Sequence, residues 1–219
     1  MIDGTKPTHL LDRHARLIRR VKLISWIGLA WLLADGVIGM TAGIAANSVV
    51  LIGWGLDCAI EAVASVVIIW RFTGDRVHSP KAERFAQKVV GISFLLLAPY
   101  IVSEAIDHLL AGNASSTSSL GIALAVADVA LMPMLGQAKR RVGRELGSHA
   151  TTSEGKQNIL CAYLSLAVFV GLGTNALFGF WWADPIVALA VAIVAIQAGL
   201  RTMRGQSYDD LAELVPAAR

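Results

Sequence analysis

Two acidic residues stand four positions apart in a long apolar run of this 219-residue chain, SVVLIGWGLDCAIEAVASVVIIW. They are Asp57 and Glu61, and the i, i+4 spacing places their Cβ atoms about 6 Å apart on one helix face. Two carboxylates this close, without a positive partner, can direct oxygens at one cation, and should share a proton when no metal is bound. The pair is typical of a site that exchanges a divalent cation for protons. Alternatively, one acid bonds to a neighbouring helix and the other faces a hydrated gap.

A second helix has to complete such a site, and the segment SEGKQNILCAYLS, residues 153–165, offers suitable ligands. Glu154, Gln157 or Asn158, and Cys161 fall on one helical stripe, because their offsets are 3, 4 and 7 residues. A thiolate beside carboxylates suits zinc better than magnesium or calcium. Alternatively, Cys161 is a small buried apolar residue and Glu154 a solvated residue of the first helical turn. The predicted metal ligands are Asp57, Glu61, Glu154, Gln157 and Cys161.

The elements that must position these residues are apolar blocks. The chain is 55% hydrophobic and 16% charged, and its mean hydropathy is +0.60. Blocks of about 20 apolar residues have the length that crosses a hydrocarbon core of about 30 Å. We therefore predict an all-α integral membrane protein with six transmembrane helices, at residues 23–46, 48–70, 89–111, 120–135, 159–180 and 185–200.

Basic residues predict the orientation of these helices. All 19 Lys and Arg residues fall in the segments 6–22, 71–88, 139–156 and 201–219, and the three intervening turns have none. With six spans, the four basic segments lie on one side, and the positive-inside rule makes that side cytoplasmic. We expect a cytoplasmic amphipathic segment at residues 1–22, a six-helix domain at 23–200 and a short cytoplasmic tail at 201–219. The basic excess reflects topology and attraction to anionic lipid, and predicts no nucleic-acid partner.

Acidic side chains inside the blocks need an explanation, because each costs at least about 2.5–3.5 kcal/mol at mid-membrane. They are Asp35, Asp57, Glu61 and Asp128, with Glu104 and Asp107 nearer the end of the third block. We expect no Lys or Arg deep enough to pair with them, so they must be protonated, hydrated or neutralised by a cation. Asp35 and Asp128 either belong to an ion route or bond across helices to Ser, Thr or backbone. A nucleotide-binding loop and a catalytic triad are not found, so we do not expect an enzyme.

Six spans with both ends inside, and an acidic pair after SVVLIGWGLD in span two, resemble the cation diffusion facilitator family. That family carries a second ligand pair early in span five, where Gln157 and Cys161 stand in place of its usual His and Asp. The motif FWWADP is similar to the family's start of span six. The chain most resembles the branch of vertebrate transmembrane protein 163, a zinc-transporting branch without a long C-terminal domain. The resemblance implies a homodimer that exchanges cytoplasmic divalent metal for protons.

Our leading hypothesis is efflux of zinc or a similar transition metal by proton antiport, through a site between spans two and five. The metal would be cargo, with no permanently bound cofactor. We expect a multi-pass protein in the bilayer of a bacterial cytoplasmic membrane. One alternative is a non-transporting scaffold or subunit that has lost the span-five ligands. Another is a proton-coupled transporter of a different substrate.

Overall fold

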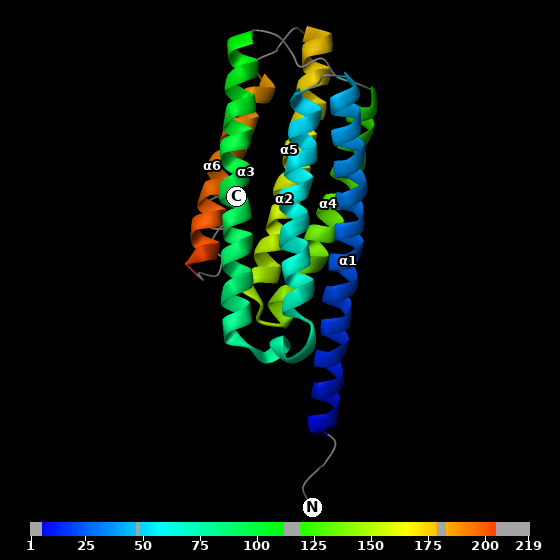
Figure 1. Ribbon diagram of the computed structural model, residues 1–219, viewed down its shortest axis with the longest axis vertical. Helices are drawn as coiled ribbons and strands as arrows, with labels where there is room; N and C mark the ends of the chain where they lie inside the picture. The colour runs from blue at the N-terminus through cyan, green and yellow to red at the C-terminus, as the bar shows by residue number, and fades with distance from the viewer. Residues whose placement is uncertain (1–5, 47–48, 112–118, 179–182, 205–219) are drawn as a thin grey trace, which may run out of the picture.

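The computed structural model is a bundle of α-helices, described for residues 6–46, 49–111, 119–178 and 183–204 (Figure 1). Every predicted apolar block contains a helix, and no strand occurs in these ranges. The predicted all-α class is therefore confirmed. The long helices are α1 (Lys6–Ala46), α2 (Val49–Arg71), α3 (Pro80–Ala111), α4 (Ser119–Glu145), α5 (His149–Phe178) and α6 (Ala183–Met203), with the short 3-10 helix η1 (Gly74–His78) between α2 and α3.

The outer surface of the bundle is apolar. Leu110, Met134 and Ile44 expose 82%, 70% and 66% of their surface, which suits contact with lipid tails. Within the described residues, three helical stretches are long and apolar enough to cross a membrane, and a shorter apolar stretch, Leu189–Met203, lies in α6. The three stretches are Asp12–Ala42, Pro80–Asp107 and Ile122–Glu145. The membrane character is thus supported, and the number of six spans stays a prediction.

Successive helices alternate in direction (Figure 1). The start of α1, the connection from α2 to α3, the connection from α4 to α5 and the last turn of α6 therefore face one end of the bundle, which we call the basic end. α1 runs without a break through residue 22, so the predicted surface segment and the first span form one helix. This helix extends beyond the others at the basic end (Figure 1). Half of the FWWADP motif, residues 180–182, lies outside the described residues.

Glycines allow the helices to approach closely. A Cβ atom added to Gly155 would lie 2.6 Å from the carbonyl oxygen of Gly136, so only glycine fits where α5 crosses α4. Small residues let helix backbones come together in membrane bundles, where dispersion replaces the hydrophobic effect as the packing force. Similar glycine pairs lie at two further crossings, Gly36 with Gly55 between α1 and α2, and Gly91 with Gly199 between α3 and α6.

Glu83 of α3 connects the basic ends of three helices. Its carboxylate accepts hydrogen bonds from Arg71 Nε of α2 at 3.0 Å and from the backbone N–H of Ala150 in α5 at 2.9 Å. Ser148, just before α5, donates to the same carboxylate at 3.0 Å. A carboxylate at a helix N-terminus satisfies otherwise unpaired N–H groups and complements the helix dipole. Glu83 therefore fixes α2 and α5, which carry the candidate ligands, relative to each other.

Candidate metal centre

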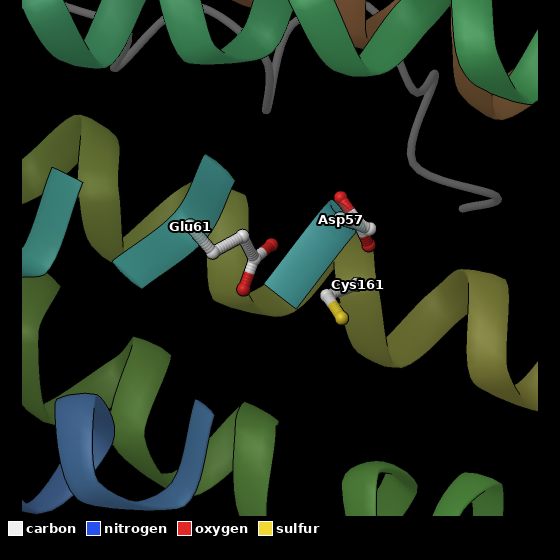
Figure 2. A group of neighbouring side chains, drawn as sticks. All are labelled: Asp57, Glu61 and Cys161. Atoms are coloured by element: carbon white, nitrogen blue, oxygen red, sulfur yellow. The ribbon is translucent and has the colours of Figure 1, made fainter. Parts of the chain in front are cut away.

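Asp57, Glu61 and Cys161 meet between α2 and α5 (Figure 2). One ligand atom from each, two carboxylate oxygens and the cysteine Sγ, lie within 4.8 Å of one another. Glu61 and Cys161 expose only 2% and 7% of their surface, and Asp57 is half-buried. Within the described ranges, this is the only group of three His, Cys, Asp or Glu side chains with such a geometry. The structure thus brings together three of the five predicted ligands.

Three of the four carboxylate oxygens of this group lack protein partners among the described residues. Both oxygens of Glu61 and Oδ1 of Asp57 are buried and accept no hydrogen bond from the part of the chain that the structure describes. A buried polar atom without a partner is costly, and such atoms in a native structure call for an explanation, such as an ion. The alternative in which Glu61 bonds to a neighbouring helix has no support among the described residues. The two acids have the free lone pairs that a cation needs.

Gln157 and Asn158 lie on the same stripe of α5 but outside the three-residue group. Gln157 Oε1 accepts a hydrogen bond from Ser93 of α3 at 3.1 Å, and its Nε2 is buried without a partner. Asn158 Nδ2 donates to the sulfur of Met132 in α4 at 3.4 Å. Gln157 therefore links α5 to α3 in this conformation, and its predicted role as a metal ligand stays a prediction.

Glu154 pairs with a lysine that we did not expect in the bundle interior. Lys139 of α4 is fully buried, and its ammonium lies 2.6 Å from Oε1 of Glu154. The expectation that no Lys or Arg lies deep enough to form a pair concerned the acids inside the apolar blocks, and Glu154 is not one of them, so that expectation stays a prediction. The alternative of a solvated Glu154 is wrong, because this residue is 2% exposed. The predicted ligand role of Glu154 stays a prediction, with an ammonium now known beside it.

A signal for Lys139 was present in the sequence. α4 continues to Glu145, ten residues beyond the end of the predicted apolar block. Leu135, Lys139 and Val142 are spaced by four and three residues and so lie on one helix face. Leu135 and Val142 are both buried, and Lys139 shares their environment. Extending the helical pattern past the apolar block would have indicated a buried lysine.

Asp35 of α1 and Asp128 of α4 are 1% exposed and bond across helices. Asp35 accepts hydrogen bonds from Trp54 Nε1 at 2.9 Å and from Cys58 Sγ at 3.2 Å. Asp128 accepts hydrogen bonds from Trp31 Nε1 at 2.8 Å and from Ser165 Oγ at 3.5 Å. Interhelical bonding is thus the alternative that the structure supports. Sequence reasoning named Ser, Thr and backbone as donors and missed the two indole N–H groups, which donate at the shorter distances.

The helices expose large apolar side chains outside and enclose several buried acids, including the acid–thiol group between α2 and α5, which is the pattern of a membrane protein with a polar site in its interior. The comparison with protein families agrees, since a profile described as a cation efflux transmembrane domain matches residues 25–209. The chain belongs to the cation diffusion facilitator family. It is a divalent cation transporter and not an enzyme, and the metal is its cargo.

Three relatives show how far the similarity extends. Transmembrane protein 163 of Xenopus laevis is 22% identical over 199 residues, which cover 90% of this chain and 71% of the relative. An uncharacterized transporter of Synechocystis is 27% identical over 213 residues, covering 94% and 68%. Magnetosome protein MamB of Magnetospira is 27% identical over 176 residues, covering 75% and 57%. The predicted likeness to the transmembrane protein 163 branch is confirmed.

Proposed function

We propose that this protein exports zinc, or a similar transition metal, in exchange for protons, and that Asp57, Glu61 and Cys161 hold the metal during transit. The observation that carries this proposal is the buried group of two carboxylates and a thiol whose ligand atoms lie within 4.8 Å. Two oxygens and a sulfur suit zinc in a site where it must bind and leave, because tetrahedral zinc then needs only one further ligand.

The spacing of the ligand atoms supports zinc. Zinc bonds of about 2.1 Å to oxygen and 2.3 Å to sulfur in a tetrahedron separate the ligand atoms by about 3.4–3.6 Å. The three atoms lie within 4.8 Å of one another, so they need to approach by no more than about 1.4 Å. Rotation about side-chain bonds achieves such a movement without displacing α2 or α5.

Protons are the counter-ion in this proposal because neither acid forms an ion pair with a basic side chain in the described part of the chain. With no metal bound, Asp57 and Glu61 are expected to share a proton, since two anionic carboxylates at this distance repel each other. Metal binding needs both carboxylates ionised and Cys161 as a thiolate, and therefore releases the shared proton and the thiol proton. Alternating exposure of the site to the two sides would then exchange metal for protons.

The proposed topology has six spans, with the basic end in the cytoplasm of a bacterial cell. All 19 Lys and Arg residues fall in segments that the predicted topology places at the basic end. The positive-inside rule therefore supports this orientation. A homodimer within the membrane is proposed from membership of the family. Efflux then means that metal enters at the basic end and leaves at the opposite one.

The test is metal flux in proteoliposomes with an imposed pH gradient. Wild-type protein should move zinc and carry protons in the opposite direction, and Asp57→Asn or Glu61→Gln should each reduce zinc flux by about 100-fold or more, because one of the two anionic ligands is lost. Asp107→Asn is the matched control, since this carboxylate is exposed on α3. If both amide variants move zinc at the wild-type rate, the site assignment is wrong.

A further inference from the structure

Lys139 places a positive charge deep between α2, α4 and α5. Its Nζ lies 2.6 Å from Glu154 Oε1 and 3.3 Å from Ser65 Oγ, and Ser65 donates to the same Glu154 oxygen at 2.6 Å. Lys139 is 0% exposed, and Ser65 and Glu154 are 1% and 2% exposed. The carboxylate and the hydroxyl thus surround a cationic group that is fully shielded from solvent.

This cluster lies one helical turn from the candidate metal centre, on the side of the basic end. On α2, Ser65 follows Glu61 by four residues, which is about 6 Å along the axis. On α5, which runs in the opposite direction, Glu154 precedes Cys161 by seven residues (Figure 1). A cation that travels between α2 and α5 from the basic end therefore meets Glu154 before it reaches Glu61.

The packing around Lys139 is specific. A Cβ atom at Gly28 of α1 would lie 3.2 Å from Lys139 Nζ, so a glycine leaves the space that the ammonium fills. The ammonium does not saturate the carboxylate, because Glu154 Oε2 is buried and accepts no hydrogen bond within the described ranges. Glu154 therefore retains lone pairs for a second interaction.

We propose that Glu154 and Ser65 form a second cation site, which the Lys139 ammonium fills in this conformation and a divalent cation from the basic end takes over during transport. The inference rests on the proposed function. A carboxylate and a hydroxyl are oxygen ligands for a divalent ion, and the ammonium stands where that ion binds. Lys139 has a flexible four-carbon stem, so its charged head can turn toward the basic end while its stem stays packed.

The charge of Lys139 controls access to the candidate metal centre from the basic end. If the ammonium left without replacement, a buried carboxylate would remain uncompensated, which is strongly unfavourable. The ammonium is therefore released when another cation arrives at Glu154. In its absence, the lysine closes the route from the basic end to Asp57 and Glu61.

The direct test is amine labelling of the wild-type protein, read residue by residue with mass spectrometry. Lys139 should be protected without metal, and its labelling should rise about tenfold at a zinc concentration of ten times the dissociation constant, as expected for a displaced competitor. Lys88, an exposed lysine of α3, is the internal control and should not change. Protection of Lys139 that zinc leaves unchanged would overturn the proposal.

A second experiment distinguishes zinc binding at this site from zinc binding at the candidate metal centre. In a background of Asp57→Asn with Glu61→Gln, zinc should still raise the labelling of Lys139, because Glu154 and Ser65 are intact. Adding Glu154→Gln should remove that response. If zinc flux fails in wild-type protein while the labelling response is present, the proposed function is wrong and this site stands. If zinc flux is normal and the labelling response is absent, the proposed function stands and this second site is wrong.

Discussion

Glu61 and Glu154 are two buried glutamates between the same pair of helices, and their carboxylates have different surroundings. Each is 2% exposed. Glu154 has an ammonium at 2.6 Å and a hydroxyl at the same distance, whereas both oxygens of Glu61 lack a partner. Equal burial thus coexists with opposite electrostatic arrangements. This difference is the one expected if Glu61 belongs to the proposed metal site, whereas Glu154 already has the Lys139 ammonium beside it.

The largest expected contrast is in stability. Lys139→Met should lower the free energy of unfolding by about 3–5 kcal/mol, because it leaves the carboxylate of Glu154 buried without a cation. Glu61→Gln should leave stability unchanged or raise it, since a neutral amide replaces an acid that has no partner. Unfolding in mixed detergent micelles, followed by circular dichroism, measures both.

The double variant Lys139→Met with Glu154→Leu is the control for this contrast. Replacing a buried ion pair by apolar residues is often neutral or stabilising, so the double variant should recover most of the lost stability. Equal destabilisation by Lys139→Met and Glu61→Gln would contradict the distinction between the two acids.

Proton release on zinc binding gives a second comparison of Glu61 with Glu154. Zinc binding at Asp57 and Glu61 should release protons, so zinc affinity should rise with pH by up to about tenfold per pH unit for each proton released. Lowering the pH adds protons that compete with the metal, and affinity falls. Zinc titrations in two buffers of different ionisation enthalpy count the protons.

Glu154→Gln is the matched variant for this measurement. Its carboxylate is already paired with Lys139, so the number of protons released at the candidate metal centre should stay the same. Glu61→Gln should remove the release of the proton shared by the two acids and leave only the thiol proton of Cys161. If zinc binding releases the same number of protons from Glu154→Gln as from Glu61→Gln, the assignment of the exchangeable proton to the Asp57–Glu61 pair is wrong.

Metal preference should depend on the thiol. Cys161→Ser should weaken zinc binding by about tenfold and leave manganese binding nearly unchanged, because a hydroxyl is a poorer zinc ligand than a thiolate and manganese prefers oxygen. Competition titrations with both metals measure the change. Cys58→Ser is the control, since Cys58 donates to Asp35 and is not part of the three-residue group. Equal losses in both cysteine variants would argue against Cys161 as a ligand.

The smallest effect concerns the indole that binds Asp128. Trp31→Phe should cost about 1–2 kcal/mol of stability, because it removes a hydrogen bond to a buried carboxylate and leaves the weaker one from Ser165. Trp26→Phe, at an exposed indole of the same helix, should change stability little. Thermal unfolding in detergent compares the two, and equal shifts would show that the bond to Asp128 contributes nothing.

The sequence by itself determined the local features of this protein. Apolar blocks of membrane-spanning length predicted the helices, and their ends agree with α1, α2 and α3 to within a residue or two at the end opposite the basic end. The i, i+4 spacing placed Asp57 and Glu61 on one face, because that relation depends only on the geometry of a single helix. The acidic pair in its apolar context also led to the family.

Only the tertiary structure decided which residues face these acids. Cys161, Gln157 and Glu154 share one stripe of α5, yet Cys161 meets the acid pair, Gln157 contacts Ser93 and Glu154 contacts Lys139. Periodicity within one helix cannot fix the height and rotation of its neighbours, which depend here on glycine contacts such as Gly136 with Gly155. The burial of Lys139 also depends on how neighbouring helices pack against each other. Its cost is acceptable only because the packing of α4 against α5 brings a carboxylate to its ammonium.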